Sequence, residues 1–103
     1  MMTAAELSRA FEGRRVEFPP PLRLLRPKDA LEYIQIALDN SLYLIGVDGY
    51  RILESGCIEP DQKLSAGYES LDRTLQGSLA AIRSCLHDPL AVFEVSVSDD
   101  PDG

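Results

Sequence analysis

The residue types best suited to nucleophilic or metal chemistry are few in this sequence: two cysteines, Cys57 and Cys85, and one histidine, His87. Cys85 and His87 lie two positions apart in a stretch with helical spacing, so their side chains would point about 200° away from each other. A nucleophilic cysteine needs a base within hydrogen-bonding reach. A metal site needs CxxC spacing or a histidine cluster, and this sequence has neither. We therefore expect no catalytic residue, no metal site, no cofactor and no enzyme activity.

Two other patterns resemble ligand sites only superficially. Gly46-Val-Asp-Gly49 is similar to a glycine-rich phosphate loop, but the residues after it predict a strand, whereas phosphate loops lead into a helix. Asp99, Asp100 and Asp102 belong to an acidic tail, residues 98–103, which we expect to be disordered and to hold a cation only weakly.

The run from Leu42 to Leu53, LYLIGVDGYRIL, is the strongest structural signal. Two apolar segments flank Asp48-Gly49, a dipeptide favoured in two-residue hairpin turns because both central residues need positive φ. We therefore predict a β-hairpin over residues 42–53 at the centre of a sheet. Its register would place Tyr43, Ile45, Val47, Tyr50, Ile52 and Glu54 on one face, and Leu42, Leu44, Gly46, Arg51, Leu53 and Ser55 on the other.

The remaining patterns predict helices around this hairpin. Apolar residues at helical spacing predict two amphipathic helices over about 27–40 and 69–87, and Thr3 with Glu6 forms a capping-box pattern for a short N-terminal helix. Alternation predicts a C-terminal strand over 91–97, with Glu94 and Ser96 on its polar face. Residues 15–18 are compatible with a short edge strand, and residues 59–67 with a loop. The chain should form a single α+β domain over residues 1–103, in which two layers pack helices against a mainly antiparallel sheet.

The net charge of −7, from 17 acidic and 10 basic side chains, limits the possible partners. It disfavours nucleic acids and anionic membranes and favours basic proteins. The basic side chains concentrate in the first 28 residues, where they could neutralise the acidic remainder or form an arm for an anionic partner. The sequence shows no secretory signal and no bilayer-spanning apolar run, so we expect a cytoplasmic chain with reduced cysteines.

The segment from Ala30 to Leu53, ALEYIQIALDNSLYLIGVDGYRIL, together with the acidity, resembles the small immunity proteins of bacterial polymorphic-toxin and contact-dependent inhibition systems. The resemblance implies an inhibitor that binds a cognate toxin domain, often a basic nuclease. Such an inhibitor blocks the active site or an essential surface of the toxin.

A contact surface for such a partner is predicted from exposed carboxylates and from tyrosines, which are common anchors at interfaces. The candidate residues are Glu32, Asp39, Tyr43, Asp48, Tyr50, Glu54, Glu59 and Asp61. Two alternatives stay open. The tyrosines could simply complete a core, or an uncovered sheet face could form a homodimer or a small-ligand pocket in a regulatory module.

Overall fold

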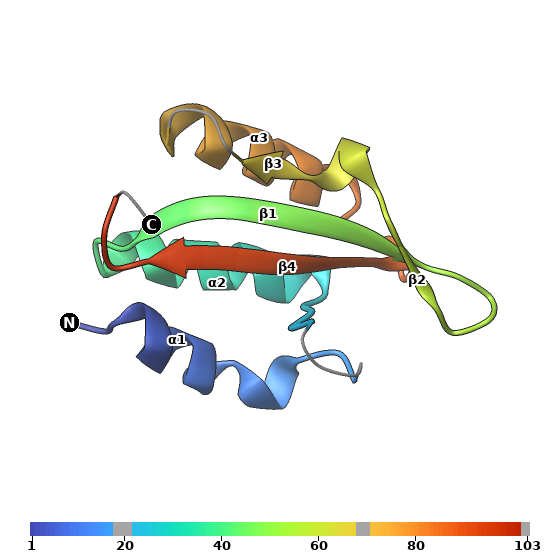
Figure 1. Cartoon of the computed structure of the whole chain (residues 1–103), viewed down its shortest axis with the longest axis horizontal. Coiled ribbons are helices and arrows are strands. Elements are labelled where there is room, and N and C mark those ends of the chain that lie inside the picture. Colours follow the sequence, from blue (N-terminus) through green and yellow to red (C-terminus); the bar gives the residue numbers. More distant parts are fainter. Residues whose placement is uncertain (18–21, 68–70, 102–103) are drawn as a thin grey trace.

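An antiparallel β-sheet and three α-helices make up the part of the chain that this computed structural model describes, residues 1–17, 22–67 and 71–101 (Figure 1). The helices are α1 (Ala4–Ala10), α2 (Pro27–Asp39) and α3 (Leu71–Ser84). The strands are β1 (Tyr43–Ile52), β2 (Ile58–Pro60), β3 (Ala66–Gly67) and β4 (Ala91–Ser98), and two 3-10 helices are η1 (Glu12–Arg14) and η2 (Gln62–Leu64). The predicted α+β class and mainly antiparallel sheet are confirmed.

β1 is a single continuous strand, so the predicted hairpin with its turn at Asp48-Gly49 is wrong. β4 runs antiparallel along one edge of β1, and β2 and β3 run antiparallel along the other. The reversal comes later, where Gly56 has a φ of 84° and its N–H donates to the Leu53 carbonyl at 2.9 Å. The hairpin is therefore formed by β1 and β2, with its turn at residues 54–56.

Gly49 is required for close approach to Leu64 rather than for a turn. A Cβ added at Gly49 would lie 2.7 Å from the Leu64 carbonyl oxygen and closer still to Leu64 Cβ. Beside it, the Asp61 N–H donates to the Gly49 carbonyl at 2.8 Å, and the Gly49 N–H donates to Ser65 Oγ at 3.1 Å. Residues 59–67, predicted to be a loop, therefore pair along β1 as two short strands separated by η2.

A β-bulge at Ile45 decides which side chains of β1 face the helices. Leu44 and Gly46 pair with successive residues of β4, so Ile45 is an extra residue in the ladder. In a regular strand Leu44 and Val47 would point to opposite faces, but here both are buried in the same cluster. The sequence prediction, which assumed unbroken alternation, placed Val47 on the wrong face.

The helices begin and end close to their local signals. Thr3 Oγ1 accepts the Glu6 N–H at 3.2 Å and the Glu6 carboxylate accepts the Thr3 N–H at 3.1 Å, which is the predicted capping box. Pro27 is the first residue of α2, where its missing N–H costs no hydrogen bond. α3 ends at Ser84, three residues before the predicted end, because the next backbone bonds run to the third preceding residue. The predicted start of this helix, before residue 71, lies outside the described residues.

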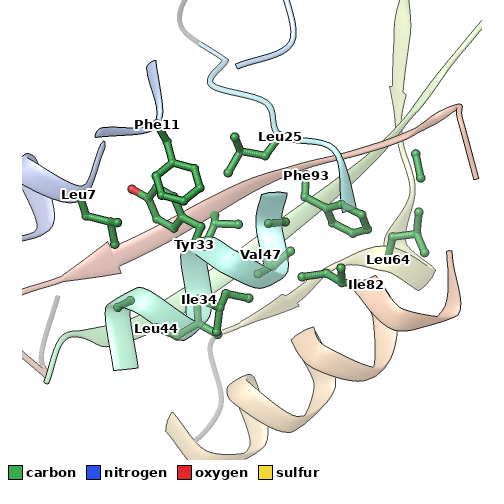
Figure 2. Close-up of a cluster of buried hydrophobic side chains, with 14 of the residues drawn as sticks. Leu7, Phe11, Leu25, Tyr33, Ile34, Leu44, Val47, Leu64, Ile82 and Phe93 are labelled. Carbon is green, nitrogen blue, oxygen red and sulfur yellow. The ribbon is translucent and has the colours of Figure 1, made fainter. Parts of the chain in front are cut away.

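One apolar cluster packs the helices against one face of β1 and β4 (Figure 2). We call this face of the two strands the helix side. The buried members of the cluster include Leu7, Phe11, Tyr33, Ile34, Leu44, Val47, Ile82, Phe93 and Val95. The rings of Phe11 and Tyr33 meet edge to face, with centroids 4.9 Å apart, so α1 packs directly on α2. Burial of these side chains is the main source of stability for a domain of this size.

The basic N-terminal segment is bound to this body by its own ion pairs. Arg14 forms ion pairs with Glu32 and, at 3.6 Å, with Asp29 on α2. The Val16 N–H donates to the Leu24 carbonyl at 2.8 Å, but residues 15–17 form no strand. The suggested strand over 15–18 is therefore wrong for its described part, and residue 18 lies outside the described residues.

The acidic end of the chain is more ordered than the sequence predicts. Ser98 is the last residue of β4, and Asp99 Oδ1 accepts the Ala4 N–H at 2.9 Å. The Asp100 N–H donates to Ser98 Oγ at 3.1 Å. The predicted disorder is therefore wrong for residues 98–101, and residues 102–103 lie outside the described part.

Ser41 offers a first test of the fold because it has a φ of 58°, in the region that favours glycine. It follows α2 in a Schellman motif, in which the Leu42 N–H donates to Ala37 at 2.9 Å and the Ser41 N–H to Leu38 at 3.1 Å. We expect Ser41→Gly to raise the free energy of unfolding by about 0.5–1 kcal/mol, measured by urea denaturation. Ser41→Ala is the matched control and should give no gain. Equal stability of the two variants would contradict the left-handed conformation.

Candidate functional site

The face of β1 and β4 that points away from the helix side carries the side chains best suited to binding a partner. We call it the open face and define it by Tyr43, Asp48, Tyr50 and Ile52 of β1 and Val92, Glu94 and Ser96 of β4. In Figure 1, α2 lies behind β1 and β4, and no helix lies in front of them. Asp48 and Ser96 are exposed, and both tyrosines are half-buried. The helices of the described chain therefore leave this face accessible.

The segment that precedes α2 and contains Leu24 and Leu25 covers part of the open face. Leu25 pairs with Phe93 across the outer edge of β4 through two N–H···O bonds of 2.8 and 2.9 Å. Leu25 belongs to the helix-side cluster, so Leu24 points the other way. Leu24 and Val92 are 1% and 0% exposed, yet neither belongs to that cluster. This segment therefore shields Val92, directly beside its cross-strand neighbour Tyr50.

Two carboxylates face each other on the open face, because Asp48 pairs directly with Glu94. Like charges in this arrangement destabilise a sheet. The Arg23 N–H donates to Glu94 Oε2 at 3.1 Å, while the Arg23 guanidinium binds Glu12 and Ser8 instead. Within residues 1–17, 22–67 and 71–101, neither Asp48 nor Glu94 forms an ion pair. The open face therefore carries an uncompensated negative site.

The titration of Tyr50 reflects this environment. Burial raises the pKa of its phenol above the ordinary value of 10.0, and the charges of Asp48 and Glu94 raise it further. Both carboxylates disfavour the phenolate because they lie near it on the same face. Tyr50, Asp48 and Glu94 thus form one electrostatic unit, made of an aromatic ring and two carboxylates.

Removing the two charges tests this unit. In the double variant Asp48→Asn/Glu94→Gln, the pKa of Tyr50 should fall toward 10.0 but stay above it, because burial is the largest cause of the shift. The phenol titration is followed by NMR on ring-labelled tyrosine, with the Tyr50 signal assigned from Tyr50→Phe. Asp39→Asn, on α2, should leave the Tyr50 pKa unchanged. An unchanged pKa in the double variant would show that the carboxylates do not face the ring.

The residues predicted to contact a partner are divided among different parts of the molecule. Tyr43, Asp48 and Tyr50 lie together on the open face. Glu32 and Asp39 lie on α2, where Glu32 binds Arg14 and Asp39 accepts a hydrogen bond from Gln35 at 3.0 Å. α2 packs on the helix side, so these two carboxylates do not belong to the same surface as the tyrosines.

The other three predicted contacts lie near the β1–β2 hairpin. Glu54 is exposed in the turn. Glu59 lies opposite Arg51 in the backbone ladder of β1 and β2. Asp61 lies 3.9 Å from the Arg51 guanidinium, which also binds Asp88 at 3.0 Å. Glu59 and Arg51 point to the helix side, and Asp61 contributes to a structural ion-pair cluster there. Of these three, Glu54 lies at the end of the sheet, where it can extend the open face.

Four members of the open face were missing from the predicted contact set: Ile52, Val92, Glu94 and Ser96. Glu94 was assigned correctly to the polar side of its strand, but nothing local indicated that this strand pairs with the residues around Asp48. Val92 gave no signal because its neighbours in sequence are also apolar and buried. The contribution of both residues follows from strand pairing over more than 40 residues, which alternation along one strand cannot predict.

Cys85 and His87 lie in different environments. Burial raises the pKa of the Cys85 thiol, with a further contribution from the Asp88 charge, and Cys85 Sγ donates to the Ala81 and Ile82 carbonyls. His87 is exposed beyond the end of α3. Across residues 1–17, 22–67 and 71–101, no three His, Cys, Asp or Glu side chains are grouped to hold a metal, and no helix could cross a membrane. Both cysteines are free.

Comparison with known proteins adds no family or relative. No protein-family model matches the chain, and no curated protein matches it either.

Proposed function

We propose that this protein is an immunity protein that binds a basic bacterial toxin domain through its open face and inhibits it. The supporting observation is that Asp48 and Glu94, beside Tyr50, form no ion pair within the described residues and lie on a sheet face that no helix of the described chain covers. A basic side chain of a partner would supply the missing counter-charge, and tyrosine rings are common interface anchors.

Like charges that face each other without a counter-charge lower the stability of the free protein. Arrangements that lower the stability of the folded protein are found mainly at functional sites. Elsewhere in the described chain, the exposed carboxylates of Glu12 and Glu32 have arginine partners. The open face therefore offers a cationic partner two neighbouring carboxylates that form no ion pair within the described residues.

The size of the open face constrains the complex. β1 has ten residues and would extend about 33 Å, and two strands span about 10 Å, so the face measures roughly 300 Å² in projection. Stable interfaces bury about 800 Å² on each partner. The partner must therefore reach beyond the two strands, toward the turn at residues 54–56 with Glu54 and toward the segment that contains Leu24.

The class of partner follows from the resemblance to immunity proteins, which implies a cognate toxin encoded next to the inhibitor. Co-expression with the product of the adjacent gene should give a one-to-one complex and protect the host cell from the toxin. Absence of both the complex and the protection would contradict the proposal. If the protein on its own elutes from gel filtration at twice the mass of one chain, and the product of the adjacent gene does not change this mass, the open face would instead join two copies of the chain.

Charge reversal at the open face should slow association with that toxin. We expect Asp48→Lys to lower the association rate constant about tenfold at low salt, with a smaller loss at high salt because the interaction is screened. Asp39→Lys makes the same change of charge on α2 and should alter the rate less than about twofold. Stopped-flow or surface-binding kinetics at several salt concentrations measure both. Equal effects of the two variants would show that only the net charge matters.

A further inference from the structure

We propose that the open face binds the guanidinium of an arginine from the partner, seated against the Tyr50 ring between Asp48 and Glu94. This inference rests on the proposed function, because it specifies which cation of a basic partner the surface recognises. The three residues are brought together by the pairing of β1 with β4, in which Asp48 lies opposite Glu94 and Tyr50 opposite Val92.

The same combination of groups already binds an arginine elsewhere in this molecule. The Arg14 guanidinium lies 4.6 Å from the centroid of the Phe11 ring, and it forms ion pairs with Asp29 and Glu32. One aromatic ring and two carboxylates therefore suffice to hold a guanidinium in this chain. The open face presents one ring and two carboxylates, and within the described residues no cationic side chain pairs with either carboxylate.

The site on the open face is held in place before a partner arrives. The Arg23 N–H fixes Glu94 Oε2 at 3.1 Å. Tyr50 and Asp48 lie on the same rigid strand, two residues apart and therefore on the same face. The floor beside the ring is apolar because Leu24 and Val92 are buried there. A partner side chain thus meets an ordered site that loses little entropy on binding.

Arginine fits this site better than lysine. A guanidinium is planar, stacks on aromatic rings and donates several hydrogen bonds in one plane, so it can contact the ring and both carboxylates together. A lysine ammonium is a compact and strongly hydrated charge that contacts the ring less well. The proposal therefore predicts selectivity between two side chains of equal charge, which net acidity alone would not produce.

The test uses the full chain and three small probes: N-acetyl-arginine amide, N-acetyl-lysine amide and N-acetyl-citrulline amide. Binding is followed by NMR at low salt through the ring signals of Tyr50. We expect the arginine probe to shift these signals with a dissociation constant at least about threefold lower than that of the lysine probe. The uncharged citrulline probe should cause no comparable shift, and Asp48→Asn/Glu94→Gln should abolish the shift caused by arginine.

Each other result overturns the arginine site. Equal shifts of Tyr50 with the arginine and lysine probes would show a surface that attracts any cation, which still agrees with the proposed function. Unchanged Tyr50 ring signals with every probe would also overturn it. The proposed function fails on a different result, the absence of a complex with the adjacent gene product.

Discussion

Gly49→Ala is expected to lower the free energy of unfolding by about 2–4 kcal/mol, a large part of the 5–15 kcal/mol typical of a single domain. The added Cβ would lie 2.7 Å from the Leu64 carbonyl oxygen, and the Leu64 backbone cannot withdraw without losing its place beside β1. The Asp61 and Ser65 hydrogen bonds to Gly49 would be strained by the same displacement. Urea denaturation measures the loss as a lower midpoint at an unchanged slope.

Gly13→Ala is the matched control for this prediction. A Cβ at Gly13 meets nothing within 4 Å, and Gly13 is not a residue with positive φ. Its substitution should change the stability by no more than about 0.5 kcal/mol or raise it slightly. If Gly49→Ala were as mild as Gly13→Ala, the close contact between β1 and Leu64 would be refuted.

Tyr50→Ala is expected to accelerate dissociation of the toxin complex about 30-fold, which corresponds to about 2 kcal/mol of binding free energy. The substitution removes an anchor ring of the open face, two residues from Asp48 on β1 and opposite Val92. Association should change little because both carboxylates remain, so the effect should appear in the dissociation rate. Surface-binding kinetics separate the two rate constants.

Tyr50→Phe is the control for this variant because it keeps the ring and removes only the hydroxyl. Its dissociation rate should stay within about threefold of the unmodified protein. Circular dichroism and denaturation of both variants check that the fold is retained, since Tyr50 also lies beside Val92. If Tyr50→Ala dissociated as slowly as Tyr50→Phe, the ring would not be an anchor.

The elements that depend on local signals could be predicted from the sequence. Thr3 and Glu6 cap α1, Pro27 begins α2, and alternation identified β4. Each of these signals comes from residues a few positions apart, whose interactions do not depend on the rest of the fold. The α+β class followed from the order of these elements.

The prediction of a hairpin over residues 42–53 was wrong because Asp-Gly has more than one structural use. Glycine supplies positive φ in a turn, but it also allows another part of the chain to approach the backbone closely. At Gly49 the second use applies, and the residue that approaches, Leu64, lies 15 positions later. The glycine that does supply positive φ is Gly56, at the true turn.

The candidate site was predictable only in part for the same reason. Tyr43 and Tyr50 were placed on one face, and they share it, although in a continuous strand with a bulge at Ile45 rather than in two arms of a hairpin. Asp48 was predicted in a turn and lies instead opposite Glu94. The carboxylate pair results from contact between distant strands, which the sequence pattern did not reveal.

Cross-saturation NMR of the isotope-labelled protein in complex with the unlabelled adjacent gene product tests the open face most directly. Signal loss should be strongest at Tyr50, Asp48 and Glu94 and extend toward Glu54, while the exposed residues of α2, including Asp39, stay unaffected. Signal loss confined to the helices, with Tyr50 and Glu94 unchanged, would contradict the open face as the binding surface.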